Sequence, residues 1–159
     1  MTAIKEIGKI LLTYFISTIA FYIGIIITSD EISFTTDTEL KREWIAVVLF
    51  TIVFLTLIRL LKLRFETVVI FLVIIMFFLL FLILNKGFFE TYLWSTPDEL
   101  KFPIMSFISI WITIPFQGII WTLVGFDMIK ITEIIVPLYV ALLGLISYFI
   151  INFKKKKFE

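Results

Sequence analysis

The chain of 159 residues contains neither cysteine nor histidine. The absence of cysteine excludes disulfide bonds and thiolate nucleophiles. The absence of histidine excludes a histidine general base and haem ligation by histidine, and the two absences together exclude the usual zinc sites. Carboxylates and carbonyls are the remaining metal ligands, and they form no recognisable cluster in the sequence. We therefore expect neither a cofactor nor a metal site.

The chain also lacks an excess of either charge. Its 14 basic and 13 acidic residues give a net charge of +1, so no global field points to nucleic acid as a partner. The signatures H-E-x-x-H and G-x-S-x-G and the phosphate-binding loop are absent. The longest polar stretch, Ser29–Glu43, is far too short to form an independent domain. We expect that the protein is not an enzyme.

Apolar side chains, in contrast, are abundant. They make up 61% of the residues, against roughly 45–50% in soluble domains. A soluble protein of this length could not bury so much apolar surface, whereas a lipid bilayer removes the need to do so. The 19 Phe residues, with only six Gly, are typical of an AT-rich genome and favour a bacterial source. We expect a bacterial protein of the cell membrane, with the lipid bilayer as its surroundings.

Five apolar segments approach the ~20 residues that cross the hydrocarbon core as a helix. They are Ile7–Thr28, Trp44–Leu61, Thr67–Leu84, Ile104–Phe126 and Ile131–Phe153. Unpaired backbone groups are costly in lipid, so runs of this length form helices. The sequence predicts an all-α integral membrane protein, a compact bundle of five hydrophobic helices. Residues 1–159 then form a single transmembrane domain.

The distribution of basic residues conflicts with five crossings. The four-lysine tail, Lys154–Lys157, is predicted to be cytoplasmic, because Lys and Arg are retained on that side. Nine of the 14 basic residues, the four lysines of the tail included, lie together on one side of the membrane only if the number of crossings is even. They are Lys5, Lys9, Arg59, Lys62, Arg64 and the four lysines of the tail.

Two topologies therefore remain open. We favour five full spans, because hydropathy is usually the stronger signal. The alternative has four spans plus a re-entrant or broken segment around Pro115, which lies at the centre of Ile104–Phe126. The choice also decides on which side the N-terminus lies.

A polar stripe marks this fourth segment. Ser106, Ser109, Thr113 and Gln117 are spaced by three, four and four residues, which places them on one helical face. Pro115 frees a backbone carbonyl one turn earlier. Such a face can line a path for a small polar solute or an ion, although polar residues more often join neighbouring helices.

The first segment carries a stripe of small residues. Thr13, Ser17, Ala20 and Gly24 share one face at spacings of four, three and four. Small residues let another helix approach closely, so this is a candidate helix-contact face, inside the bundle or towards a partner.

Two functions follow from these stripes. We favour an accessory or regulatory membrane protein that acts through helix–helix contacts, with a membrane-protein partner or a second copy of itself. The alternative is a small channel or carrier subunit, with its polar path along Ser106, Ser109, Thr113 and Gln117.

Overall fold

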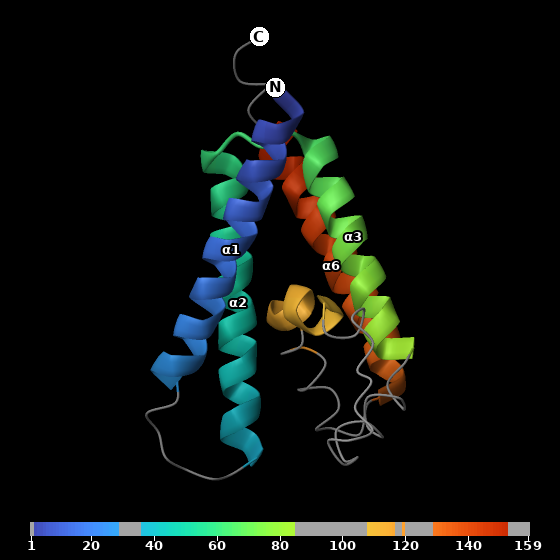
Figure 1. Ribbon diagram of the computed structural model, residues 1–159. Coiled ribbons are helices and arrows are strands. Elements are labelled where there is room, and N and C mark those ends of the chain that lie inside the picture. Colours follow the sequence, from blue (N-terminus) through green and yellow to red (C-terminus); the bar gives the residue numbers. More distant parts are fainter. Residues whose placement is uncertain (1, 29–35, 85–107, 117–118, 120–128, 153–159) are drawn as a thin grey trace, which may run out of the picture.

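The computed structural model describes residues 2–28, 36–84, 108–116, 119 and 129–152, and all regular structure within these ranges is helical (Figure 1). The four long helices are α1 (Thr2–Thr28), α2 (Thr36–Leu60), α3 (Phe65–Leu84) and α6 (Ile129–Asn152). Residues 108–116 form a shorter helix, here called the cross segment. The prediction of an all-helical chain is confirmed.

Three helices in the described part are long and apolar enough to cross a membrane. The stretches are Ala3–Ile27, Phe65–Leu82 and Ile134–Asn152, whereas the apolar part of α2, Trp44–Leu60, is shorter. The helix α2 begins eight residues before the predicted segment, at Thr36. Hydropathy misses these first turns because residues 36–43 are mostly polar, yet Glu, Leu, Lys and Arg are good helix formers.

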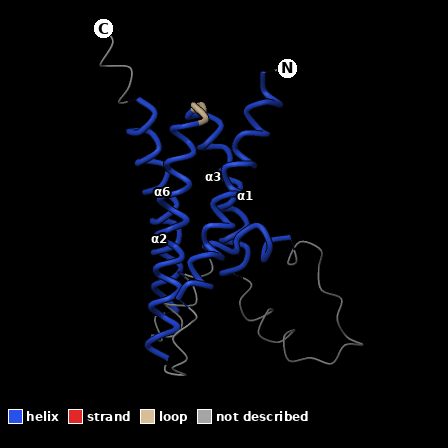
Figure 2. The backbone as a smooth tube through the Cα atoms, turned by 90° about the vertical axis from the view of Figure 1, so that its left-hand side faces the viewer, coloured by secondary structure: helices blue, strands red, loops and turns tan. Residues whose placement is uncertain are grey.

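The long helices form two antiparallel pairs, α1 with α2 and α3 with α6, and fewer contacts join α2 to α6 and α1 to α3 (Figure 1). At one end of the molecule, the backbone N–H of Arg64 donates to Glu6 Oε2 at 3.2 Å. At the same end, Phe65 contacts Tyr148, with ring centroids 5.1 Å apart. The start of α1, the α2–α3 turn and the last turns of α6 therefore lie together (Figures 1 and 2).

The α2–α3 turn reverses the chain within a few residues. Lys62 adopts the left-handed backbone conformation, with φ of 50°. The N–H of Leu63 donates to the carbonyl of Ile58 at 3.2 Å, and that of Lys62 to Arg59 at 3.3 Å. These two bonds form a Schellman motif, which satisfies carbonyls that the end of a helix leaves free. Leu63 and Ile58 occupy the two positions at which this motif commonly has apolar residues, and both are buried.

The turn gathers cationic side chains at this end. Arg59, Lys62 and Arg64 are all exposed, and Lys5 is exposed nearby on α1. Lys9, also on α1, pairs with Glu6 at 2.8 Å. We call this end of the molecule, with Lys5, Lys9, Arg59, Lys62 and Arg64, the basic end.

The cross segment, orange in Figure 1, lies between the two helix pairs and runs across the long helices rather than beside them. Its contacts reach Tyr14 of α1, Phe50 of α2 and Tyr139 of α6. Each of these residues lies near the middle of its helix. The cross segment therefore sits about halfway along the bundle. The rest of the predicted fourth span, apart from Ile119, lies outside the described residues.

Candidate functional site

The described part of the predicted polar stripe lies in the core. Ser109 and Thr113, both on the cross segment, are completely buried. The hydroxyl of Thr113 donates to the backbone carbonyl of Ser109 at 2.7 Å. Such a bond satisfies a buried hydroxyl within its own helix, which removes the cost of placing it in apolar surroundings. Ser106 and Gln117, the other two residues of the stripe, lie outside the described residues.

The backbone near Pro115 receives a hydrogen bond from another helix. Because proline has no N–H, it cannot donate to the carbonyl four residues earlier, that of Trp111. The Tyr14 hydroxyl, which comes from α1, donates to the next carbonyl in that turn, that of Ile112. This bond ties the cross segment to α1 at the turn that Pro115 weakens.

Five aromatic rings surround this contact, one from each described helix. The Tyr14 ring lies 5.2 Å from Phe71 of α3 and 5.9 Å from Phe50 of α2. Phe116 of the cross segment lies 5.3 Å from Phe50 and 5.9 Å from Tyr139 of α6. We call Tyr14, Phe50, Phe71, Phe116 and Tyr139 the aromatic cluster. Tilted and edge-to-face pairs of this kind stabilise by about 0.5–1.5 kcal/mol each beyond their buried area.

A second hydrogen bond links the two helix pairs at the aromatic cluster. The hydroxyls of Thr51 on α2 and Tyr139 on α6 lie 2.5 Å apart. Thr51 also donates to the carbonyl of Val47 at 2.7 Å, which leaves the Tyr139 hydroxyl as the donor to Thr51. The net contribution of one such hydrogen bond to stability is about 0.5–1.5 kcal/mol, and the bond fixes the alignment of α2 against α6.

The predicted helix-contact face of α1 is covered within the chain. Thr13, Ser17 and Gly24 are buried, and Ala20 is half-buried. Thr13 and Ser17 each donate to the carbonyl four residues earlier, at 2.9 and 2.7 Å. A Cβ atom added to Gly24 would lie 2.9 Å from the Cα of Ala46, closer than real Cβ atoms approach. The two backbones meet at Gly24, so at this position the face packs on α2.

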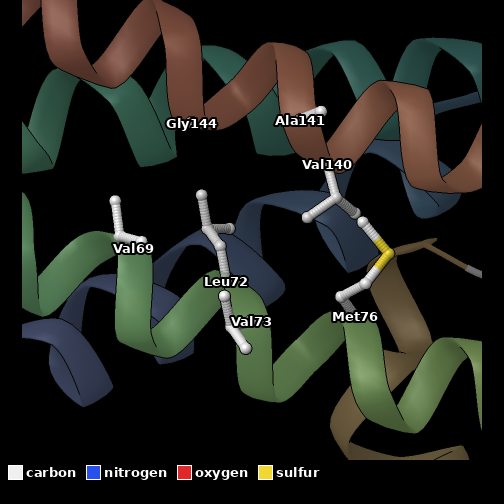
Figure 3. A pocket seen from close by; sticks show the side chains of 7 residues that line it. All are labelled: Val69, Leu72, Val73, Met76, Val140, Ala141 and Gly144. Carbon is white, nitrogen blue, oxygen red and sulfur yellow. The ribbon is translucent and has the colours of Figure 1, made fainter.

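An open groove follows the contact between α3 and α6 (Figure 3). It has a volume of about 210 Å³ and lies between one row of side chains on each helix. Its lining is apolar throughout and consists of Val69, Leu72, Val73, Met76, Val140, Ala141 and Gly144. The small residues Ala141 and Gly144 leave the space that forms it.

Charged groups that could hold a metal do not gather in the described part of the chain. There, no three residues of the types His, Cys, Asp and Glu lie together. Glu6 is engaged by Lys9 and by the backbone of Arg64. The chemistry at the centre of the bundle is therefore that of hydroxyls and aromatic rings.

Sequence reasoning did not single out Tyr14, Phe116 or Tyr139. The available signal was the tyrosine hydroxyl itself, because a buried Tyr inside an apolar segment needs a hydrogen-bond partner. Nothing in the spacing of the two tyrosines indicated that their partners are the Ile112 carbonyl and Thr51, which lie 98 and 88 residues away.

The described helices and their apolar lengths define an all-helical protein with three helices able to cross a membrane. No protein-family model matches the chain, and no curated protein and no solved structure matches it either.

Proposed function

We propose that this is a multi-pass protein of the cell membrane in which four long helices cross the bilayer. Three of them are long and apolar enough by composition, and the 17 residues of Trp44–Leu60 reach the lower limit for the fourth, about 17 residues. Their outer faces carry large exposed apolar side chains, among them Leu11, Phe15 and Phe77. Acyl chains would cover such faces.

In this arrangement the cross segment is re-entrant. The segment lies across the bundle at mid-height. Its Ile112 carbonyl accepts a hydrogen bond from α1, and its Phe116 ring packs against α2 and α6. Non-spanning backbone at membrane depth needs protein contacts of this kind. Four crossings also bring the basic end and the tail after Asn152 to one side. Lys and Arg are enriched in cytoplasmic loops, so we assign the basic end to the cytoplasm.

Single-cysteine labelling tests this topology, since the natural chain has no cysteine. Lys5→Cys, Lys62→Cys and Glu159→Cys should all react with a membrane-impermeant maleimide from the cytoplasmic side only. Ser33→Cys, between α1 and α2, is the control and should react from the opposite side only. Labelling of Lys5→Cys and Glu159→Cys from opposite sides would establish an odd number of crossings and overturn the proposal.

Within the membrane, we propose an accessory or regulatory role that operates through contacts of the outer helix faces with another membrane protein. The observation that carries this proposal is the aromatic cluster. Its rings join all the described helices at mid-height, and Phe50 and Phe116 there are almost fully buried. A bundle whose centre is packed with side chains favours a protein that acts through contacts on its outer surface.

Cross-linking and flux measurements together test this role. A photo-reactive phenylalanine at the exposed positions Phe15, Phe77 or Phe149 should give a discrete adduct with one other membrane protein in native membranes. The same group at the buried position Phe50 should react only within the chain. Proteoliposomes of the purified protein should pass K⁺ and glycerol no faster than empty liposomes. Absence of any adduct together with measurable flux would contradict the accessory role.

The alternative, a channel or carrier subunit, has one observation in its favour. Ser109 and Thr113 lie at mid-height on the cross segment, two turns and one turn before Gln117 in the sequence. A path along this stripe predicts a K⁺ or glycerol flux that Gln117→Leu abolishes without changing the amount of folded protein.

A further inference from the structure

The contact between α3 and α6, here called the seam, is lined by different kinds of side chain as it approaches the basic end. The apolar groove occupies the middle, from Met76 to Val69 on α3 (Figure 3). One turn further, the rings of Phe65 and Tyr148 meet at 5.1 Å, and Tyr148 is 45% exposed. Beyond them lies the α2–α3 turn with the exposed Lys62 and Arg64. The order is therefore apolar, then aromatic with a hydroxyl, then cationic.

The cations at the end of this seam are not neutralised within the described residues. The only ion pair there joins Lys9 to Glu6, and Arg59, Lys62 and Arg64 form none. Glu66 is the acidic side chain of the first turn of α3 and is also exposed. Glu6 of α1 also lies here, with Oε2 at the backbone N–H of Arg64, but its charge is balanced by Lys9. Arg59, Lys62 and Arg64 against Glu66 then leave the turn positive.

The groove is too small to enclose a helix. One helical turn, about 10–12 Å across and about 5.4 Å long, occupies roughly 400–600 Å³. The groove holds about 210 Å³ and exists because Ala141 and Gly144 carry little side chain. The nearest atom to a Cβ built on Gly144 is Leu72 Cδ1 at 3.6 Å, an ordinary contact. A flexible hydrocarbon chain matches both this size and the apolar lining.

We propose that the α3–α6 seam binds one anionic phospholipid. An acyl chain fills the groove, the phosphate lies at Lys62 and Arg64, and the Tyr148 hydroxyl lies at the level of the ester groups. The inference depends on the proposed membrane location and adds a ligand to it. Tyrosine is enriched at this level of the bilayer, and basic side chains next to a membrane helix attract anionic headgroups.

Native mass spectrometry of the full chain tests the site. The protein is released from nanodiscs of equal phosphatidylglycerol and phosphatidylcholine content, and the retained lipid is identified. We expect one phosphatidylglycerol per chain. One basic side chain near an anionic headgroup changes affinity about fivefold, so Lys62→Asn with Arg64→Gln should reduce the preference for phosphatidylglycerol about 25-fold. Asn tolerates the left-handed backbone at residue 62.

Matched variants separate the two halves of the site. Ala141→Phe fills the groove and should abolish retention of either lipid, whereas Leu145→Phe enlarges an exposed residue on the same helix and should leave retention unchanged. Lys5→Gln removes an exposed charge from the basic end away from the seam and should also have no effect. Circular dichroism verifies that each variant is folded. Equal retention of the two lipids by the natural chain, or unchanged retention in Ala141→Phe, would overturn the proposal while leaving the membrane topology untouched.

Discussion

The α1–α2 pair and the α3–α6 pair both place a glycine at their contact, with opposite results. At Gly24 the backbones approach until an added Cβ would lie 2.9 Å from the Cα of Ala46. At Gly144 the nearest neighbour is the flexible tip of Leu72, at 3.6 Å, and the contact opens into a groove. A small residue permits close packing when the opposing residue is also small, and otherwise it leaves a gap.

The two pairs also differ in the rings that they contribute to the aromatic cluster. The α1–α2 pair supplies Tyr14 and Phe50, and each has two ring contacts in the cluster: Tyr14 with Phe50 and Phe71, and Phe50 with Tyr14 and Phe116. The α3–α6 pair supplies Phe71 and Tyr139, each with one ring contact in the cluster. Phe50 has no exposed surface, whereas Phe71 is half-buried. The centre of the bundle therefore depends more on the α1–α2 pair.

Replacing one ring of the aromatic cluster in each helix pair tests this difference between the pairs. These substitutions have the largest expected effect on the free energy of unfolding. Phe50→Ala should lower the free energy of unfolding by about 3–5 kcal/mol, because it opens a cavity among buried rings. Phe71→Ala should cost about half as much, because its ring is partly exposed and has one partner in the cluster. Unfolding in mixed micelles with increasing dodecyl sulfate measures both values. Equal losses for the two variants would show that the pairs contribute alike.

The two glycines provide the second and smaller test. Gly24→Ala should lower the free energy of unfolding by about 1–3 kcal/mol, because the methyl group meets the backbone of α2 and the helices must separate. Gly144→Ala should be neutral or stabilise by up to about 1 kcal/mol, since space is available and Ala favours the helix. Thermal unfolding in detergent gives the sign of each change. A destabilised Gly144→Ala would mean that the α3–α6 contact is as close as that of α1–α2.

Much of the helix pattern was predictable from the sequence. The segments Thr67–Leu84 and Ile131–Phe153 agree with α3 and α6 to within two residues, and Ile7–Thr28 agrees with α1 except that the helix begins five residues earlier, at Thr2. Uninterrupted apolar runs of this length have few alternatives to a helix. The start of α2 was missed, since its first turns are polar. The buried face of α3 could not be predicted either. Val68, Leu72, Ile75 and Leu79 form it, yet the whole helix is apolar and all its faces look alike in the sequence.

The candidate site was predictable in part. Three of the four residues in the α1 stripe, Thr13, Ser17 and Gly24, are buried in the structure, and Ala20 is half-buried. In the fourth segment the stripe marked Ser109 and Thr113, which are also buried. The aromatic cluster was not predictable, because it brings together one ring from each of five helices. Spacing along one helix determines which residues share its face, and it contains no information about which residue of another helix lies opposite.

Composition and the length of the apolar runs by themselves determined that this protein is helical, that cysteine and histidine chemistry is excluded, and where most helices lie. These properties depend on local backbone hydrogen bonding and on the transfer of side chains out of water, which act residue by residue. Only the tertiary structure decided that the cross segment lies across the bundle, that Gly24 meets Ala46 and that a groove opens beside Gly144. Those outcomes depend on the shapes of residues far apart in the chain, whose fit is defined only once the helices pack.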